Sequence, residues 1–339
     1  MHIPCDSFII EAITHEQADI SRLIFSEQKE ALMKQLTLKQ TNAAVPAIAI
    51  GCMRIGEMPP QELAKHISFC LEQGLCFFDH ADIYGRGACE ENFARALDST
   101  DIKREDLWIQ SKCGIVPGVM YDFSREHILS SVDGILKRLH TDYLDSLVLH
   151  RPDALMEPEE VAEAFDRLEA SGKVRHFGVS NHKPMQIELL KKCVRQPLEF
   201  CQMQLSLPFS SMIASGLEAN MLTEGAVDRD GSILEYTRLY DMTIQAWSPF
   251  QYGFFGGVFI GDRAQFPELN AVLDALAEKY SVTASGIAAA WILRHPANIQ
   301  MIAGTTNRAH LQEIIDGSRV ELTREEWYRL YLSAGHMLP

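Results

Sequence analysis

Four polar residues that follow short apolar runs have side chains suited to proton chemistry. Asp79 ends one run and Tyr84 follows it by five residues, while Lys112 and His150 end the next two runs. If these runs are successive parallel strands of one barrel, the four side chains reach the same rim, where barrel enzymes place their chemistry. A carboxylate, a phenol, an ammonium group and an imidazole on one rim predict a site that moves protons.

Tyr84 is the candidate general acid. A free phenol, with a pKa of ~10, is a poor proton donor at neutral pH, and a nearby ammonium group lowers that pKa. We expect Lys112 to act on Tyr84 in this way, and Asp79 to hold Lys112 charged. His150 would orient the substrate oxygen or relay the proton. Because the set contains no nucleophile or metal, another group must create the oxyanion, and hydride from a reduced nicotinamide would do so.

Each of these residues has a simpler explanation when it is taken alone. An Asp at the end of a strand caps the next helix, and a Lys is a solvated surface charge. A Tyr beside a glycine packs in a turn, and a His bonds a backbone carbonyl. Four such residues at the ends of successive strands are harder to explain in these terms, so we interpret the set as catalytic.

The composition restricts the class of protein. Of 339 residues, 47% are hydrophobic and 23% charged, and the net charge is −15. Such an acidic chain is not expected to bind nucleic acid or an anionic membrane. No apolar run approaches the ~20 residues of a membrane span, the N-terminus lacks the features of a signal peptide, and the eight cysteines have no zinc-like spacing. These features predict a cytoplasmic protein with reduced thiols and no metal site.

From Pro46 onward, short apolar runs alternate with helical patterns and predict an α/β fold, a single (β/α)8 TIM barrel. Several runs are apolar throughout, as expected of parallel strands that are covered on both faces. The candidate strands are Ala47–Gly51, Leu75–Asp79, Leu107–Cys113, Tyr143–Leu149, Val174–Val179, Leu198–Leu205, Thr243–Trp247 and Ile299–Ala303. The candidate helices include Pro60–Gln73, Ser124–Leu139, Pro158–Ala170, Pro184–Cys193, Ser232–Tyr240 and a doubled segment, Pro267–Arg294.

Two segments stand outside this alternation. Residues 1–33 are a predicted N-terminal extension, helical or disordered, with a capping-box pattern at Thr14–Gln17. Residues 34–339 are the predicted barrel domain. After the seventh candidate strand, residues 248–263 combine aromatic side chains with glycines, which is typical either of a lid over a flat ligand or of a packed loop.

Four motifs extend these observations, namely residues 78–85 (FDHADIYG), Ser111–Lys112, residues 149–153 (LHRPD) and residues 172–181 (GKVRHFGVSN). In these motifs the chain resembles the aldo-keto reductases, and most of all their bacterial members of unassigned substrate, from about Lys34 to Gly317. The resemblance implies a barrel enzyme that reduces a carbonyl group with NADPH. It places the catalytic tetrad of that family on Asp79, Tyr84, Lys112 and His150.

The resemblance also implies a nicotinamide site. Ser180, Asn181 and Gln202 match the contacts to the carboxamide, and Trp247 matches the ring that stacks on the nicotinamide. If the resemblance is left aside, Ser180 and Asn181 are expected to cap the helix near Pro184. Gln202 would then need a buried polar partner, and Trp247 would belong to the core. Further predicted cofactor residues are Gly51, Cys52 and Met53 in the turn after the first strand, and Ser248, Pro249 and Phe250 after Trp247.

The segment after the last strand suits an anion, because it offers backbone amides, hydroxyls and a basic group at the start of a helix. In the family it holds the 2′-phosphate and the adenosine. Gly304 stands where many members have Lys and His310 where many have Arg, which weakens the preference for NADPH, and Arg308 compensates. We expect NADPH, with NADH less favoured. The residues predicted to contact this part of the cofactor are Gly304, Thr305, Thr306, Arg308, His310 and Glu313.

The predicted function is therefore reduction of an aldehyde or ketone by NADPH, with Tyr84 as the proton donor. Two alternatives stay open. One is an NADP(H)-binding regulatory or redox-sensing subunit with slow turnover, whose residues 1–33 would bind a partner. The other is a lyase or isomerase that uses the same residues without a cofactor. The sequence identifies neither the small-molecule carbonyl substrate nor the oligomeric state.

Overall fold

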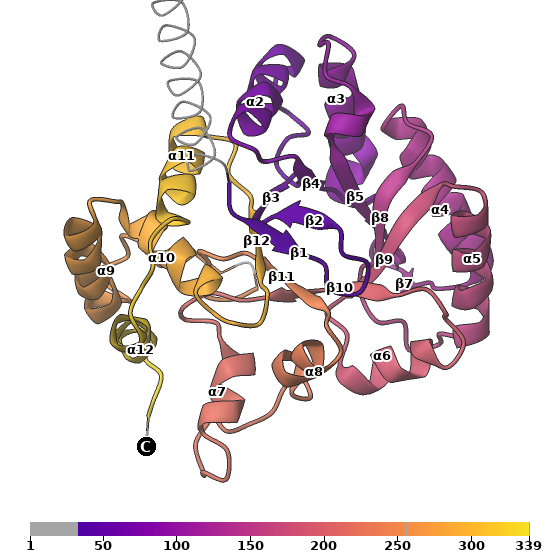
Figure 1. Cartoon of the computed structure of the whole chain (residues 1–339). Coiled ribbons are helices and arrows are strands. Elements are labelled where there is room, and N and C mark those ends of the chain that lie inside the picture. Colours follow the sequence, from indigo (N-terminus) through magenta and orange to yellow (C-terminus); the bar gives the residue numbers. More distant parts are fainter. Residues whose placement is uncertain (1–32, 255, 339) are drawn as a thin grey trace, which may run out of the picture. The chain divides into compact units, whose positions relative to one another are not determined.

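A closed barrel of eight parallel strands forms the core of the protein in the computed structural model, which describes residues 33–254 and 256–338 (Figure 1). The predicted (β/α)8 fold is thus confirmed. The predicted extension lies, except for Met33, outside the described residues. Around the barrel, each strand pairs with the next one named here and the last pairs with the first: β3 (Ile48–Gly51), β4 (Phe77–Asp79), β5 (Trp108–Cys113), β8 (Leu144–Leu149), β9 (Val174–Ser180), β10 (Leu198–Gln204), β11 (Thr243–Trp247) and β12 (Gln300–Ala303).

The apolar runs explain both the strands and the rim. Every residue of β8 is buried, as are the last five residues of β5, because helices cover one face of the sheet and the barrel interior the other. The parallel register places Gly51 beside Asp79 and Lys112 beside Val148. The carboxyl ends of the strands, and the polar residues that follow them, therefore meet at one end of the barrel.

The helices surround the barrel (Figure 1). Ser124 begins α4 by accepting a hydrogen bond from the His127 amide, as its type predicts, and Gly172 follows α5 with a φ of 72°. The doubled segment is two helices, α9 and α10. The bounds are α2 (Pro60–Glu72), α3 (Ala88–Leu97), α4 (Arg125–Arg138), α5 (Pro158–Ala170), α6 (Pro184–Lys191), α7 (Ser211–Leu217), α8 (Ile233–Leu239), α9 (Pro267–Tyr280), α10 (Ala284–Leu293), α11 (Arg308–Gly317) and α12 (Arg324–Ser333). No described helix is both long enough and apolar enough to cross a membrane.

Two short hairpins and the helices α7 and α12 are not anticipated by the sequence pattern. Antiparallel β1 (Gln35–Thr37) and β2 (Ala44–Pro46) lie across the end of the barrel where the strands begin (Figure 1). Gln40 between them donates to the carbonyl of Leu198, the first residue of β10, at 3.1 Å. The second hairpin, β6 (Ile115–Val116) with β7 (Met120–Tyr121), follows β5. Strands of two or three residues are too short to display a twofold alternation.

Candidate active site

The four predicted catalytic side chains meet at the carboxyl end of the barrel. Lys112 Nζ lies 2.8 Å from both carboxylate oxygens of Asp79, 2.7 Å from the carbonyl oxygen of His80 and 3.2 Å from Tyr84 Oη. The Tyr84 and His150 rings lie edge to face, with centroids 6.0 Å apart. The phenol therefore has the ammonium group as a direct neighbour and the imidazole across from it.

Local structure explains how these residues are presented. Asp79 is the last residue of β4, Lys112 lies one residue before the end of β5, and His150 follows β8. Tyr84 begins a 3₁₀ turn, Tyr84–Gly87, which is stabilised by the bond from its amide to the Ala81 carbonyl at 3.0 Å. Gly85 in this turn has a φ of 57°, a conformation that costs glycine little.

Lys112 is fully buried and paired. Burial disfavours its charge, but Asp79 and Tyr84 outweigh that effect, and the pKa of Lys112 is raised. Its interpretation as a solvated surface charge is thus wrong, and so is that of Asp79 as a helix cap, because the carboxylate is held by buried donors. The ion pair supplies a permanent ammonium group beside the phenol.

The pKa of Tyr84 differs from the expectation in its net direction. Lys112 lowers it, as predicted, but removal of the phenol from water is the larger effect, and the pKa is raised above its ordinary value. The sequence pattern indicates which charge is near the phenol but not how little water reaches it. Tyr84 is consequently protonated at neutral pH, which is the state that a general acid requires.

His150 is neutral. Burial, together with the charges of Lys112 and Arg151, places its pKa well below the ordinary value. Neither ring nitrogen has a hydrogen-bond partner among the described residues, and Nδ1 is buried. Its interpretation as a residue that bonds a backbone carbonyl is therefore not supported. A neutral imidazole with free nitrogens is able to donate to or accept from a ligand oxygen.

A ladder of buried glutamines, Gln110, Gln202, Gln245 and Gln300, continues from Asp79 into the barrel interior. Asp79 Oδ1 accepts from the amides of Gln110 at 2.7 Å and Gln202 at 3.2 Å. Gln110 and Gln202 both donate to Gln245, and Gln245 donates to Gln300. The roles of Gln110, Gln245 and Gln300 were not predicted from the sequence, although a polar residue inside an apolar strand is the signal for such a network. The ladder fixes the orientation of the Asp79 carboxylate.

A second acidic cluster adjoins the tetrad and was not predicted. Glu90 accepts from Ser111 Oγ at 2.7 Å and from Arg138 Nε at 2.7 Å. Asp82 has a buried oxygen, Oδ1, without a partner among the described residues. Burial, and then the charge of Glu90, raise the pKa of Asp82 to about 7. This cluster therefore contains a carboxyl group that changes its charge near neutral pH.

The predicted nicotinamide residues lie at the same end of the barrel and bond to one another. Asn181 donates to Ser180 Oγ at 2.7 Å and accepts from Trp247 Nε1 at 3.3 Å. Neither Ser180 nor Asn181 caps α6, whose N-cap is Lys183. Gln202 finds its polar partners within the protein, in Asp79 and Gln245, so its burial alone does not require a cofactor. Trp247 is half-buried at the end of β11 rather than enclosed in the core.

The segment 248–263 combines features of a lid and of a packed loop. Ser248, Pro249 and Phe250 directly follow Trp247, and the Phe254 ring meets the indole edge to face at 6.2 Å. Further along, Tyr252 and Phe259 both pack against Phe266, and Phe259 is fully buried. One part of the segment thus faces the site while another is anchored beside α9.

The other predicted cofactor residues border the same rim. Gly51 ends β3, Cys52 is buried and Met53 is exposed. Gly304, Thr305 and Thr306 follow β12, and α11 begins with Arg308 and carries His310 and Glu313. Asn307 caps this helix through the amides of Ala309 and His310, while Arg308 lies 3.6 Å from the Glu62 carboxylate of α2. Arg308, the residue predicted to bind the cofactor phosphate, therefore already has an acidic neighbour.

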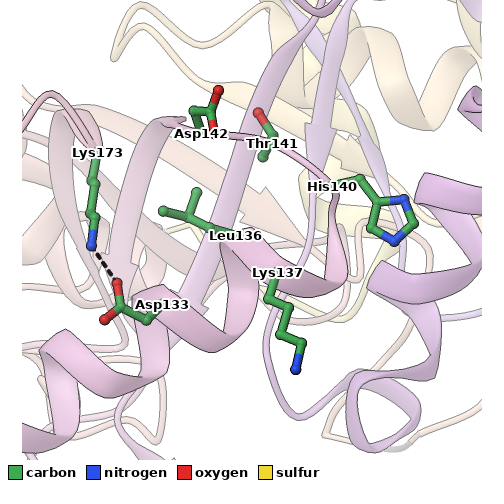
Figure 2. A pocket seen from close by; sticks show the side chains of 7 residues that line it. All are labelled: Asp133, Leu136, Lys137, His140, Thr141, Asp142 and Lys173. Atoms are coloured by element: carbon green, nitrogen blue, oxygen red, sulfur yellow. Dashed lines mark hydrogen bonds and ion pairs between the residues drawn. The ribbon is translucent and has the colours of Figure 1, made fainter.

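A hollow at the opposite end of the barrel lacks such chemistry (Figure 2). It lies between the end of α4 and the residues that precede β8 and β9. Figure 2 shows Lys173 reaching Asp133, and these two side chains pair at 2.6 Å. Leu136, Lys137, His140, Thr141 and Asp142 complete the lining. Since Lys173 is paired with Asp133 and His140 with Asp98, and these four side chains are exposed, we assign this hollow no catalytic role.

The chain belongs to the aldo/keto reductase family. The sequence pattern of the Aldo/keto reductase family matches residues 47–331, and the protein is accordingly an NAD(P)H-dependent oxidoreductase. It is 36% identical to the "Uncharacterized oxidoreductase YcsN" of Bacillus subtilis, over 82% of this chain and 90% of that protein. It is 33% identical to a "6-dehydroglucose reductase" of Agrobacterium fabrum, over 91% of this chain and 98% of that protein.

Solved structures share the fold. An aldo/keto reductase from Klebsiella pneumoniae, in complex with NADP and acetate, superposes with a TM-score of 0.67 at 23% sequence identity. The similarity covers 88% of this chain and 94% of that one. This likeness concerns the barrel, whereas the family assignment rests on the sequence.

Proposed function

We propose that this protein reduces an aldehyde or a ketone to an alcohol with NADPH, and that Tyr84 donates the proton. The observation that carries the proposal is the contact of Lys112 Nζ with both Asp79 and Tyr84 Oη. This arrangement presents a neutral phenol beside a fixed positive charge. Such a pair protonates an oxygen that gains negative charge and stabilises that charge as it forms.

Each residue has a separate part in this proposal. His150, neutral and with free nitrogens, orients the carbonyl oxygen toward Tyr84. Asp79 keeps Lys112 charged in spite of its burial. The glutamine ladder holds Asp79 in place through two amide donors. Reduced nicotinamide supplies the hydride when it is bound.

The described residues fit a nicotinamide cofactor. The half-buried Trp247 indole offers a flat face and is held by its bond to Asn181. The amides of Thr305 and Thr306 bond to no described residue, so they are free for an anionic group before α11. Arg308 favours the additional phosphate of NADPH, whereas Glu62 opposes it. We therefore propose NADPH as the preferred cofactor and expect only a moderate preference over NADH.

The proposal is tested by titrating the full-length protein with NADPH and NADH while following intrinsic tryptophan fluorescence, and then adding an aromatic aldehyde and recording the loss of reduced cofactor. Wild type and Tyr84→Phe are compared. We expect both proteins to bind NADPH equally well, and only the wild type to turn over, with a loss of at least ~100-fold in the variant.

The possible failures have different meanings. Binding without turnover in the wild type would favour a nucleotide-sensing subunit, and absence of nicotinamide binding would refute the proposed cofactor. Turnover in Tyr84→Phe at the wild-type rate would refute the proposed acid. The cytoplasmic location and the separate extension of residues 1–33 remain predictions.

A further inference from the structure

Arg151 directly follows His150 and has no anionic partner in the part of the chain that the structure describes. Its guanidinium carbon lies 6.0 Å from the centre of the Trp247 ring and 5.6 Å from that of Phe254. Within residues 33–254 and 256–338, no hydrogen bond or ion pair involves its side chain. Asp153, the nearest acid in the sequence, is occupied by the amides of Phe123 and Leu155. Arg151 therefore carries a charge that only aromatic faces stabilise.

Other partly buried arginines of the barrel are paired. Arg104 and Arg138 each hold a carboxylate oxygen at 2.7 Å, that of Asp145 and that of Glu90. Arg151 is half-buried, and burial lowers its pKa without removing its charge. A charge that is withdrawn from water without a partner is costly, and such groups are retained where a ligand completes them.

The surroundings of Arg151 indicate which kind of ligand would bind to it. Its charge acts on the His150 imidazole, and its two aromatic neighbours are the predicted nicotinamide plate, Trp247, and the tip of the segment that faces it, Phe254. Cation–π contacts hold the guanidinium in place but leave its N–H groups unused. A planar fork of N–H donors matches the two oxygens of a carboxylate or a phosphate.

We propose that Arg151 binds an anionic group of the substrate, so that the preferred substrates are aldehydes or ketones that also carry a carboxylate or a phosphate. This inference rests on the proposed reductase function and adds a substrate class to it. The carbonyl end of the substrate would lie at Tyr84 and His150, and its anionic end at Arg151, beside Trp247 and Phe254.

The test uses substrates that differ only in charge. The probes are 3- and 4-formylbenzoate and their methyl esters, which carry the same aldehyde on the same ring. Wild type, Arg151→Met and Arg151→Lys are compared by kcat/KM with saturating NADPH. Arg175→Met is the matched control, because it removes one positive charge from the opposite end of the barrel, where Arg175 meets Asp145 and Tyr143.

We expect the wild type to prefer at least one acid over its ester, and Arg151→Met to lose about 10- to 100-fold in kcat/KM for that acid. The ester should change by less than ~3-fold, Arg151→Lys should be intermediate, and Arg175→Met should keep the preference. The affinity for NADPH, measured by fluorescence, should be the same in all four proteins.

A readout without turnover accompanies the kinetics. Calorimetric titration of the NADPH complex compares 4-methylbenzoate with 4-methylbenzamide, and only the anion should bind more weakly to Arg151→Met. Equal losses for acid and ester, no preference in the wild type, or weaker NADPH binding in Arg151→Met would each overturn the inference. Reduction of the esters without any preference for the acids would leave the reductase function intact. Failure to bind NADPH or to reduce any aldehyde would instead refute that function.

Discussion

The two ends of the barrel differ in how their charged side chains are satisfied. Where the strands begin, Arg104 bonds Asp145 and His176 bonds Glu199, at 2.7 and 2.5 Å. Where the strands end, the Lys112–Asp79 pair is just as complete. Beside that pair, however, polar atoms of His150 and Asp82 lack partners among the described residues. Among the same residues, the Arg151 guanidinium contacts aromatic rings but no acid.

This difference separates stability from function. Paired charges at the first end bond one another and backbone groups, so removing one of them should weaken the fold and leave the chemistry unchanged. Groups without partners at the second end do not stabilise the fold, because burying a polar group without a hydrogen bond costs free energy of folding. For His150 and Arg151 we propose a bound ligand as the explanation. Four substitutions would break or sharpen this comparison.

The largest effect is expected from Lys112→Met, which breaks the buried ion pair at the catalytic end. Asp79 would then be a buried carboxylate without its cation, and Tyr84 would lose the positive charge beside it. We expect reductase activity to fall by about 10²- to 10⁴-fold and the free energy of unfolding by about 3–5 kcal/mol. Steady-state kinetics and urea unfolding measure the two effects. Full activity in a folded Lys112→Met would contradict the proposed role of the tetrad.

Arg104→Met removes the corresponding cation at the other end. Arg104 bonds Asp145, Thr141 and the carbonyls of Leu107 and Tyr143, so its loss should lower the free energy of unfolding by about 2–3 kcal/mol. The kcat/KM of the folded fraction, measured at 20 °C, should stay within ~3-fold of wild type. A selective loss of turnover without a loss of stability would show that the two ends are not separate in function.

Asp82→Asn should change how stability depends on pH. The folded pKa of Asp82 is raised to about 7, so the folded protein holds a proton that the unfolded chain releases near pH 4. The stabilisation is complete below pH 4 and is lost as pH rises through 7. Relative to wild type, Asp82→Asn should gain nothing at pH 4 and on the order of a few °C in Tm at pH 8. Differential scanning fluorimetry across this range measures the gain, and a constant difference would refute the assignment.

The smallest effect is expected from Lys173→Ala in the hollow of Figure 2. Its partner Asp133 is largely exposed, and exposed ion pairs contribute about 0–1 kcal/mol. Chemical unfolding should therefore detect a change below about 1 kcal/mol, and turnover should equal that of the wild type. A substantial loss of activity would give this hollow a function that its lining does not suggest.

Most of the fold, and the positions of the four proposed tetrad residues, could be predicted from the sequence, because both depend on local patterns. Apolar runs locate all eight barrel strands to within two residues, and the ends of those runs locate Asp79, Lys112 and His150. The hairpin β1–β2 could not be found in this way. Its side chains Leu38 and Val45 pack against Phe77 and Phe200 from distant strands, and such contacts have no local signature.

Properties that depend on surroundings could not be predicted either. The pKa of Tyr84 is raised by burial and lowered by the Lys112 ammonium group, and only the structure shows how deeply the phenol is buried. Arg151 belongs to the sequence motif of residues 149–153, but its lack of an acidic partner among the described residues appears only when the neighbouring strands are in place. The partners of Gln202 likewise come from β4 and β11.

The glutamine ladder also constrains how this sequence can evolve. Gln110 and Gln245 each donate a hydrogen bond to the other, at 2.8 and 3.2 Å, deep inside the barrel. If one becomes apolar, the other loses two buried hydrogen bonds and keeps the rest: Gln110 those to Asp79 and Ser146, and Gln245 those to Gln300 and Gln202. A change at either position alone therefore costs stability, and a second change at its partner recovers part of that cost. The interior beneath the Asp79 carboxylate should thus change in correlated steps more often than the exposed surface does.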